Sequence, residues 1–234
     1  MVTSGGVLAD VGTDHGYIPI VLVQKHKITG AIAMDINEGP LARAKEHIKD
    51  ACLEPYIQTR LSDGVQALTE GEADSIVVAG MGGELILHIL EEGEKVCRAA
   101  KEMILQPQSE LQKVREYLRI KHYKIMDEDM VCEDGKYYPM MRVIPVEEDD
   151  SWSKMNEESV TACDIYGPLL LRNGHPVLRR FLVKQHRQLT EIIQNLKKQQ
   201  ETPAIEERIG QLQRELMYNE SAYTILGAIK NAGI

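Results

Sequence analysis

The sequence lacks the features that mark metal-binding, disulfide-stabilised and membrane-spanning proteins. Its four cysteines are Cys52, Cys97, Cys132 and Cys163. No two of them form a C-x-x-C pair, which argues against a zinc site and against a disulfide framework. No apolar run is long enough to cross a bilayer, and no basic-then-apolar leader precedes the first predicted strand. We therefore expect a cytoplasmic protein that binds no metal and contacts no membrane.

Basic residues are fewer than acidic ones, but the imbalance is uneven along the chain. The net charge of −9, taken alone, disfavours a nucleic-acid partner. Of the 27 basic and 36 acidic residues, 11 and 9 lie within residues 151–234 (net +2), which leaves 16 and 27 within residues 1–150 (net −11). The stretch Arg172–Lys198 holds seven cations and one anion, Glu191. The basic charge is therefore local, and its position matters more than the sum.

Short apolar runs alternate with amphipathic stretches over residues 7–146, which is typical of strands alternating with helices. The predicted strands are Val7–Ala9, Gly30–Asp35, Tyr56–Leu61, Ala73–Ala79, Met103–Leu105, Tyr123–Val131 and Tyr137–Val146. The predicted helices are Ile18–Lys27, Leu41–Ala51, Glu84–Leu90 and Glu110–Ile120. Ser109 and Gln112 have the spacing of a capping box, and Glu133-Asp134-Gly135 is typical of a hairpin turn. We predict an α/β fold whose sheet is mostly parallel, with an antiparallel hairpin at its edge.

An acidic link, Glu147–Ser151, separates this region from a helical C-terminal part. Beyond the link, two faces of apolar residues recur at helical spacing, the second running from Ile205 to Leu226. The first face comprises Leu178, Phe181, Leu182, Leu189, Ile192, Ile193 and Leu196. Thr202-Pro203 is typical of an N-cap followed by a proline in the first helical turn. We predict an α/β domain over residues 1–150 and an antiparallel, coiled-coil-like helical hairpin over residues 151–234.

A tight glycine turn follows the first predicted strand, in the sequence V-L-A-D-V-G-T-D-H-G-Y-I-P at Val7–Pro19. Ligands of parallel α/β sheets bind beyond the carboxyl ends of the strands, where a helix N-terminus also offers backbone N–H groups. The residues expected at that edge are Asp10–Tyr17, Asp35, Asp63, Gly80–Gly83 and Gln106. This pattern predicts a cofactor of the nucleotide type.

The identity of the cofactor follows from the acids and glycines around this turn. The spacing Gly12-x-x-x-Gly16 lacks the third glycine of the dinucleotide fingerprint, which disfavours a dehydrogenase. Acids in and before the turn would repel a pyrophosphate, but they suit a cofactor that carries a sulfonium and an amino group. Asp35 lies 23 residues after Gly12, where a carboxylate can accept both ribose hydroxyls, and Asp63 is placed to accept from an adenine amino group. We predict S-adenosylmethionine as the cofactor.

Several motifs resemble those of the bacterial tRNA (adenine(22)-N1)-methyltransferase family. They are D-V-G-T-D-H-G-Y-I-P, A-M-D-I-N, S-D-G, A-G-M-G-G, I-L-Q-P and Y-G-P-L-L-L, in family order from about Leu8 to the end. The resemblance implies a Rossmann-like class I methyltransferase domain, a helical hairpin, and methyl transfer to N1 of the adenine at position 22 in the D-arm of tRNA. Family members usually carry a basic helix before the first strand. Only Met1–Gly6 precede it here, so contacts made by that helix have no support in this sequence.

The strand ends and the resemblance together give candidate site residues. Those for the cofactor are Asp10, Gly12, Thr13, Gly16, Asp35, Ile36, Asp63, Gly64 and Gly80. Those for adenine and methyl transfer are Asp14, His15, Tyr17, Gly80, Met81 and Gly82, with Tyr17 stacking on a base extruded from its helix. Those for tRNA are Arg172, Arg179, Arg180, Lys184 and Arg187, the last four spaced to share much of one helical face. The expected partner is tRNA, and the expected oligomeric state is a monomer or a weak dimer.

Two other interpretations stay open at this point. A methyltransferase acting on a small molecule or a protein would leave the basic helix as an ordinary solvated face, and a tRNA titration at several salt concentrations separates the two. A catalytically silent cofactor-binding protein would instead use the apolar face from Leu178 to Leu196 to dimerise or to dock a partner. Binding of S-adenosylmethionine without methyl transfer to any RNA would favour that interpretation.

Overall fold

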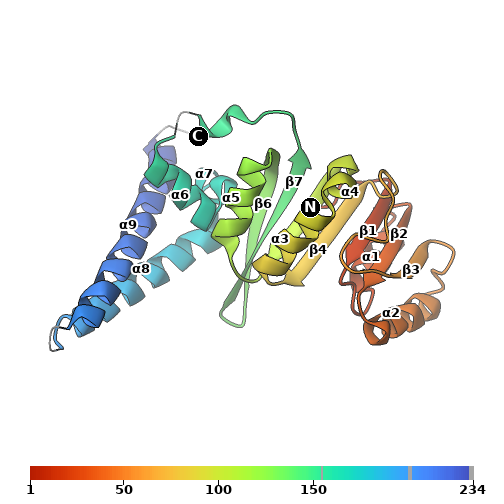
Figure 1. The fold of residues 1–234 in the computed structure, drawn as a ribbon, viewed down its shortest axis with the longest axis horizontal. Coiled ribbons are helices and arrows are strands. Elements are labelled where there is room, and N and C mark those ends of the chain that lie inside the picture. Colours follow the sequence, from red (N-terminus) through yellow and green to blue (C-terminus); the bar gives the residue numbers. More distant parts are fainter. Residues whose placement is uncertain (154, 200–201, 232–234) are drawn as a thin grey trace. The chain divides into compact units, whose positions relative to one another are not determined.

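The computed structural model describes residues 1–153, 155–199 and 202–231, and its chain forms two compact units (Figure 1). The first unit comprises residues 1–110, 117–127 and 139–149, and the second comprises residues 111–116, 128–138 and the chain from residue 150 onward. The last change of unit falls within the acidic link. Residues 111–116 begin a helix and residues 128–138 form the turn end of a β-hairpin, and both segments belong to the second unit. The two units are therefore interleaved in sequence.

The first unit is built on a seven-stranded sheet with the order β3-β2-β1-β4-β5-β7-β6. Its strands are β1 (Val7–Val11), β2 (Gly30–Asp35), β3 (Ile57–Leu61), β4 (Ser75–Met81), β5 (Glu102–Pro107), β6 (Tyr123–Glu133) and β7 (Lys136–Pro145). Strands β1 to β5 are parallel, whereas β7 pairs with β5 in the antiparallel sense. The predicted sheet is confirmed. The strand order reverses between β1 and β4, so the switch point lies beyond the end of β1.

Five helices follow the strands of this region: α1 (Tyr17–Gln24), α2 (Glu38–Asp50), α3 (Gly83–Glu92), α4 (Glu94–Ala99) and α5 (Leu111–Ile120). Helices α1 and α2 pack through Ile20 and Ile48 on the sheet face that carries Leu8. Alternate strand residues on the other face, such as Ala9 and Val78, are buried as well. The central strands are therefore apolar on both faces, as a parallel sheet covered on two sides requires.

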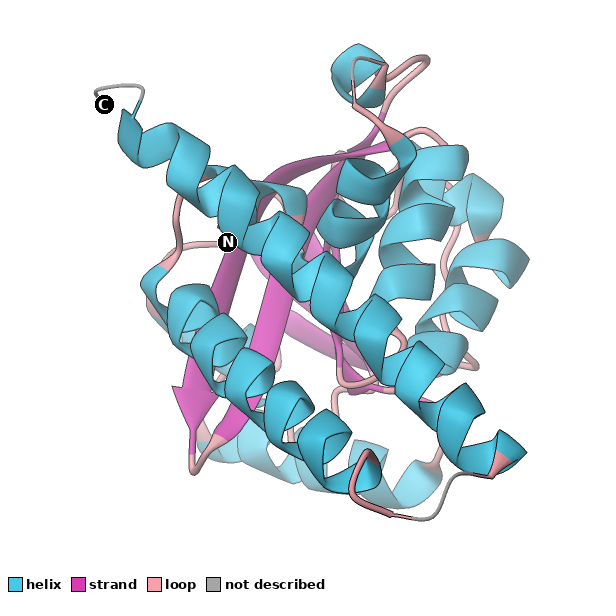
Figure 2. Cartoon of the chain, turned by 90° about the vertical axis from the view of Figure 1, so that its left-hand side faces the viewer, coloured by secondary structure: helices cyan, strands magenta, loops and turns pink. Residues whose placement is uncertain are grey.

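The second unit is mainly helical. A short 3₁₀ helix (Asp150–Trp152) precedes α6 (Glu157–Tyr166), α7 (Pro168–Arg172), α8 (Pro176–Leu196) and α9 (Pro203–Asn231). Helices α8 and α9 lie side by side (Figure 2) and run antiparallel, because Leu182 contacts Asn219 while Leu189 shares a core cluster with Leu212. The N–H group of Ile205 donates to Thr202 Oγ1 (3.3 Å), which confirms the predicted N-cap. None of the described helices combines the length and apolarity needed to cross a membrane.

Three details differ from the predictions. Helix α5 has Glu110 (φ 53°) as its N-cap, with no side-chain cap hydrogen bond, so the capping box of Ser109 and Gln112 is wrong. The Ser109 hydroxyl instead accepts from the N–H group of Gly83 (3.2 Å), because a neighbouring turn competes for it. Ile192 is 44% exposed rather than part of the buried face, since it lies about 100° around α8 from the buried Ile193. Helices α4, α6 and α7 were not predicted, because they are short or lack one-sided periodicity.

Candidate functional site

The turn between β1 and α1 brings glycines and backbone amides to the switch point. Gly12 and Gly16 have φ values of 70° and 72°, in the left-handed region that favours glycine. At Gly12 a Cβ atom would also overlap the Cε atom of Met81 on β4. The N–H group of Thr13 donates to the carbonyl of Met34 on β2 (2.8 Å), which ties the turn to the neighbouring strand. The predicted strand–turn–helix geometry is confirmed.

Asp10 is a buried carboxylic acid at the carboxyl end of β1. Asp10 is only 3% exposed, and Thr13 Oγ1 donates a hydrogen bond to its Oδ2 atom (2.6 Å). Burial raises the pKa of Asp10 from 3.8 to about 6, an effect that the Thr13 hydrogen bond offsets only in part. The ionised form is thus incompletely compensated within the described residues. A cationic ligand group placed beside it would stabilise the carboxylate.

The next two strands also end in acids. Asp35, the last residue of β2, is 8% exposed and uses Oδ1 to accept one backbone N–H group (2.9 Å). No hydrogen bond to its Oδ2 atom is formed by the residues that the structure describes. Asp63 and Gly64 follow β3, and the N–H group of Ser62 donates to the carbonyl of Asp35 (2.9 Å), which joins the two strand ends. Ile36, the residue after β2, is 58% exposed.

Beyond β4 the chain forms a glycine-rich loop. Gly80 (φ 76°) donates its N–H group to Oε1 of Gln106 (2.9 Å). A Cβ atom at Gly83 would overlap the carbonyl of Ser109, so the last glycine of the loop permits close packing against the chain after β5. Gly80 and Gly82 are exposed. These two glycines can therefore form an open rim, whereas Gly83 has a packing role.

Three of the six residues predicted for adenine and methyl transfer, Asp14, His15 and Tyr17, lie in one cluster with helix α2. Oδ1 of Asp14 accepts from Nη2 of Arg43 (2.7 Å), and its Oδ2 lies 3.5 Å from Nε2 of His15. The rings of His15, Tyr17 and His47 lie 5.2–5.4 Å apart, each pair within 16° of parallel. Tyr17 is 60% exposed and presents its ring to solvent. The structure thus brings Asp14, His15 and Tyr17 together.

Arg43 and His47 of this cluster were not predicted. Their i, i+4 spacing on α2 places them on one face of the helix, which was the available signal. That this face meets the turn after β1 follows only from the packing of α2 on the sheet. Among the described residues, no group of three or more His, Cys, Asp or Glu side chains is placed to hold a metal ion.

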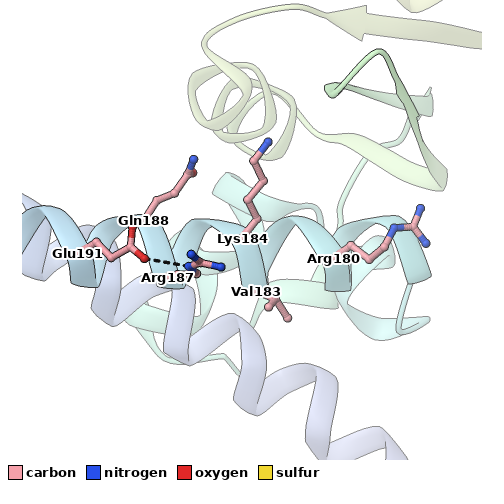
Figure 3. Close-up of a pocket in the computed structure, with 6 residues that line it drawn as sticks. All are labelled: Arg180, Val183, Lys184, Arg187, Gln188 and Glu191. Carbon is pink, nitrogen blue, oxygen red and sulfur yellow. Dashed lines mark hydrogen bonds and ion pairs between the residues drawn. The ribbon is translucent and has the colours of Figure 1, made fainter.

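The predicted tRNA-contacting residues belong to the second unit. Arg180, Lys184 and Arg187 line an open hollow of about 500 Å³ along α8, together with Val183, Gln188 and Glu191 (Figure 3). Figure 3 shows Lys184 and Gln188 pointing in the same direction, while Arg187 turns toward Glu191, with 2.8 Å between Nε and Oε1. The charge of Arg187 is thus partly neutralised, so Arg180 and Lys184 carry most of the free positive charge of this face.

The two remaining arginines lie elsewhere. Arg172 is exposed at the end of α7. Arg179 is half-buried on the side of α8 that faces Tyr223 of α9. Burial raises the pKa of Tyr223, and the positive charge of Arg179 offsets part of that rise. The prediction that Arg179 shares a face with Arg180, Lys184 and Arg187 is wrong, because successive residues of a helix are about 100° apart.

Comparisons with known proteins agree with this geometry. The family model described as tRNA (adenine(22)-N(1))-methyltransferase matches residues 8–219. The tRNA (adenine(22)-N(1))-methyltransferase of Bacillus subtilis (strain 168) is 37% identical over 210 residues, which are 90% of this chain and 82% of that protein. The crystal structure of the B. subtilis m1A22 tRNA methyltransferase TrmK has a TM-score of 0.81 at 30% identity, over 96% of this chain and 94% of that one.

A further similar structure contains a bound cofactor. Streptococcus pneumoniae Sp1610 in complex with S-adenosyl-L-methionine has a TM-score of 0.78 at 29% identity, over 96% of this chain and 94% of that one. The match of the family model over most of the chain agrees with the strand order and the glycine turn described above. The chain therefore belongs to the tRNA (adenine(22)-N(1))-methyltransferase family.

Proposed function

We propose that the first unit holds S-adenosylmethionine and the reacting adenine, and that the basic face of α8 in the second unit binds the tRNA backbone. As a member of its family, the chain transfers a methyl group from S-adenosylmethionine to N1 of adenine 22 in tRNA. The observation that carries the assignment of the cofactor site is the row of three carboxylates, Asp10, Asp35 and Asp63, at the ends of the adjacent parallel strands β1, β2 and β3.

The residues at these strand ends fit the groups of the cofactor. The buried Asp10 faces the amino and sulfonium charges, and Asp35 accepts from the ribose hydroxyls. Asp63 accepts from the adenine amino group of the cofactor while Ile36 covers its ring. Thr13, Gly64 and the glycines at 12, 16 and 80 allow the backbone to approach closely, since none of them carries a bulky side chain. When bound, S-adenosylmethionine supplies a methyl group that passes from sulfur to N1 of the substrate, so positive charge moves to the base and no proton has to be removed.

The residues around the Asp14 turn would serve the acceptor. N1 of adenine carries a lone pair at neutral pH, so the protein needs no strong base and has mainly to hold the base in line for transfer. The exposed ring of Tyr17 stacks on the extruded base, and the carboxylate of Asp14 with His15 stabilises the positive charge that develops on it. Gly80–Gly82 form the rim past which the methyl group moves.

The compartment is inferred from the substrate, and the oligomeric state is a separate prediction. Because tRNA is the substrate, we place the reaction in the cytoplasm. We also propose that the enzyme works as a monomer or a weak dimer, which light scattering coupled to size-exclusion chromatography measures directly.

The test is transfer of labelled methyl from S-adenosylmethionine to unmodified bacterial tRNA, followed by nucleoside analysis. We expect the wild-type protein to form 1-methyladenosine at position 22. Asp35→Ala should lose this activity and most of the cofactor binding that calorimetry measures. No 1-methyladenosine from a wild-type protein that binds S-adenosylmethionine would contradict the assigned reaction. An Asp35→Ala protein that binds the cofactor normally would contradict the assigned site.

The role of α8 gives a separate prediction. Arg180→Gln combined with Lys184→Gln should weaken tRNA binding at least tenfold near 0.1 M salt and make the plot of log affinity against log salt shallower by about 2, because two phosphate contacts are lost. Binding of S-adenosylmethionine should not change. Filter binding at several salt concentrations measures the slope.

The matched control removes the same charge from the exposed side of α9. Arg208→Gln combined with Arg214→Gln leaves the face of α8 intact, so tRNA affinity should change less than threefold. Equal weakening by both pairs would mean that net charge alone, and not the face of α8, determines tRNA binding.

A further inference from the structure

We propose that Arg43 and His47 of α2 are positioning residues for methyl transfer, which hold the Asp14–His15 turn in the conformation that contacts adenine. The inference rests on the proposed function, because it takes Asp14, His15 and Tyr17 as the residues beside the acceptor base. Arg43 and His47 themselves contact the turn and act through it.

Arg43 holds the side chain of Asp14. Asp14 has a φ of 49°, a left-handed conformation that residues other than glycine adopt rarely, so the turn needs contacts that maintain it. Nη2 of Arg43 donates to Oδ1 of Asp14 at 2.7 Å. Both side chains are about half exposed, so the ion pair contributes little to global stability. Its effect is instead local, since it fixes which way one carboxylate points.

His47 holds the backbone of His15. Its Nδ1 atom lies 2.9 Å from the carbonyl oxygen of His15. A carbonyl oxygen only accepts, so Nδ1 of His47 must carry the hydrogen. The ring of His47 also lies between 5.3 and 5.4 Å from the rings of Tyr17 and His15, in nearly parallel planes. One side chain of α2 therefore contacts both rings assigned to the acceptor and the peptide group between His15 and Gly16.

The orientation of the His15 ring shows what the contact with His47 achieves. Its Nδ1 atom is buried and has no hydrogen-bond partner among the described residues, whereas its side chain as a whole is 36% exposed. Nε2 is therefore the nitrogen that can face a substrate, and it lies 3.5 Å from Oδ2 of Asp14. A rotated or displaced His15 would lose this arrangement. Arg43 holds Asp14 and His47 holds His15, so two residues one helical turn apart on α2 hold both members of the Asp14–His15 pair.

The experiment compares variants of α2 in the full-length protein. His47→Asn keeps a donor at the position of Nδ1 but removes the ring, and His47→Phe keeps a ring but removes the donor. Arg43→Gln removes the charge that holds Asp14, and Lys45→Gln is the control, because Lys45 is exposed on another side of α2. The measurements are kcat and KM for tRNA, the calorimetric Kd of S-adenosylmethionine, and the Tm.

We expect kcat to fall about 10- to 100-fold in Arg43→Gln and His47→Phe, since a misplacement of about 1 Å can have that effect. His47→Asn should retain kcat within about fivefold, and Lys45→Gln should match the wild type. Cofactor Kd should stay within about threefold throughout, because the backbone that approaches the cofactor is held by Thr13 and Met34. This split between kcat and cofactor affinity would not arise from a general loss of structure.

Two results would overturn the inference. Normal kcat in both Arg43→Gln and His47→Phe would show that the turn needs neither contact. A loss of cofactor affinity as large as the loss of kcat would show that α2 merely supports the fold of the cofactor site. If the wild-type protein itself forms no 1-methyladenosine, the proposed function fails, and this result is distinguishable because it appears before any variant is made.

Discussion

Replacing Arg115 with alanine should lower the free energy of unfolding of the second unit by about 3–5 kcal/mol, the range found when one partner of a buried ion pair is removed. Nε of Arg115 donates to Oε1 of Glu128 at 2.9 Å, and the two side chains are 1% and 0% exposed. Removal of the guanidinium leaves the carboxylate of Glu128 buried without its counter-charge. Glu128→Ala should have an effect of similar size, because it leaves the guanidinium of Arg115 buried without its counter-charge.

This ion pair also joins the ends of two helices. Nη1 of Arg115 donates to the carbonyls of Asp164 and Ile165 near the end of α6 (both 3.0 Å). Oε2 of Glu128 accepts from the N–H group of Leu169 in the first turn of α7 (2.8 Å). The positive group therefore lies at a helix C-terminus and the negative group at a helix N-terminus, the favourable arrangement for both helix dipoles.

The same contacts explain the motif Y-G-P-L-L-L. Gly167 has a φ of 97°, and a Cβ atom there would lie 2.7 Å from Oε1 of Glu128. Leu170 and Leu171 are buried, and the hydroxyl of Tyr166 donates to Gln185 of α8 (2.8 Å). The motif thus forms the junction on which the position of α8 depends, rather than a catalytic element.

Urea denaturation followed by far-UV circular dichroism measures the effect, and amide hydrogen exchange assigns it to α6–α9. The control is Arg187→Ala, whose ion pair with Glu191 has a similar distance of 2.8 Å but side chains that are 81% and 56% exposed. That change should alter stability by no more than about 0.5 kcal/mol. Equal effects of Arg115→Ala and Arg187→Ala would contradict the dominant role of burial.

The affinity for S-adenosylmethionine should fall about tenfold per pH unit as the pH is lowered below about 6, because the cationic part of the cofactor binds the ionised form of Asp10. Burial raises the pKa of Asp10 to about 6 in the free protein, so a modest drop below neutral pH protonates it. Calorimetry between pH 5 and pH 8, without tRNA, gives the profile. Asp10→Asn should bind about 10- to 100-fold more weakly at pH 7.5 and lose this part of the pH dependence.

The stability of the free protein should change in the opposite direction. The pKa of Asp10 is higher in the folded state than its value of 3.8 in the unfolded chain, so the folded state binds the proton more tightly. Stability therefore falls as the pH rises from about 4 to about 6 and then levels off. Asp10→Asn keeps an acceptor for Thr13 and removes this penalty, so it should stabilise the free protein at pH 7.5 by up to about 3 kcal/mol.

Weaker binding combined with higher stability would identify Asp10 as a ligand-binding group rather than a structural one. The control is Glu102→Gln, at the opposite end of the sheet, where Glu102 accepts from Thr3 N and Oγ1 and from Ser75 Oγ. That variant should lose stability and keep its affinity for the cofactor. An Asp10→Asn protein that is less stable and binds S-adenosylmethionine normally would contradict the assignment.

Local sequence patterns predicted which residues lie at the carboxyl edge of the sheet. Parallel strands place all their carboxyl ends together, so short local motifs ending at Asp10, Asp35 and Asp63 were enough to predict one shared site. The left-handed glycines of the first turn were equally predictable, because their signal lies within a few consecutive residues. The helical hairpin followed from the 3.6-residue period of its apolar face.

The side chains that support this edge of the sheet and hold the second unit together could not be predicted from the sequence, because their contacts depend on tertiary packing. The face of α2 that carries Arg43 and His47 meets the turn at Asp14 because α1 and α2 pack on the same side of the sheet. Arg115 and Glu128 are joined to the α6–α7 junction, some 40 to 50 residues away in sequence. Such contacts have no local periodicity, since the partners are brought together by the packing of whole elements, and a hydroxyl such as that of Ser109 bonds to whichever donor that packing places nearest.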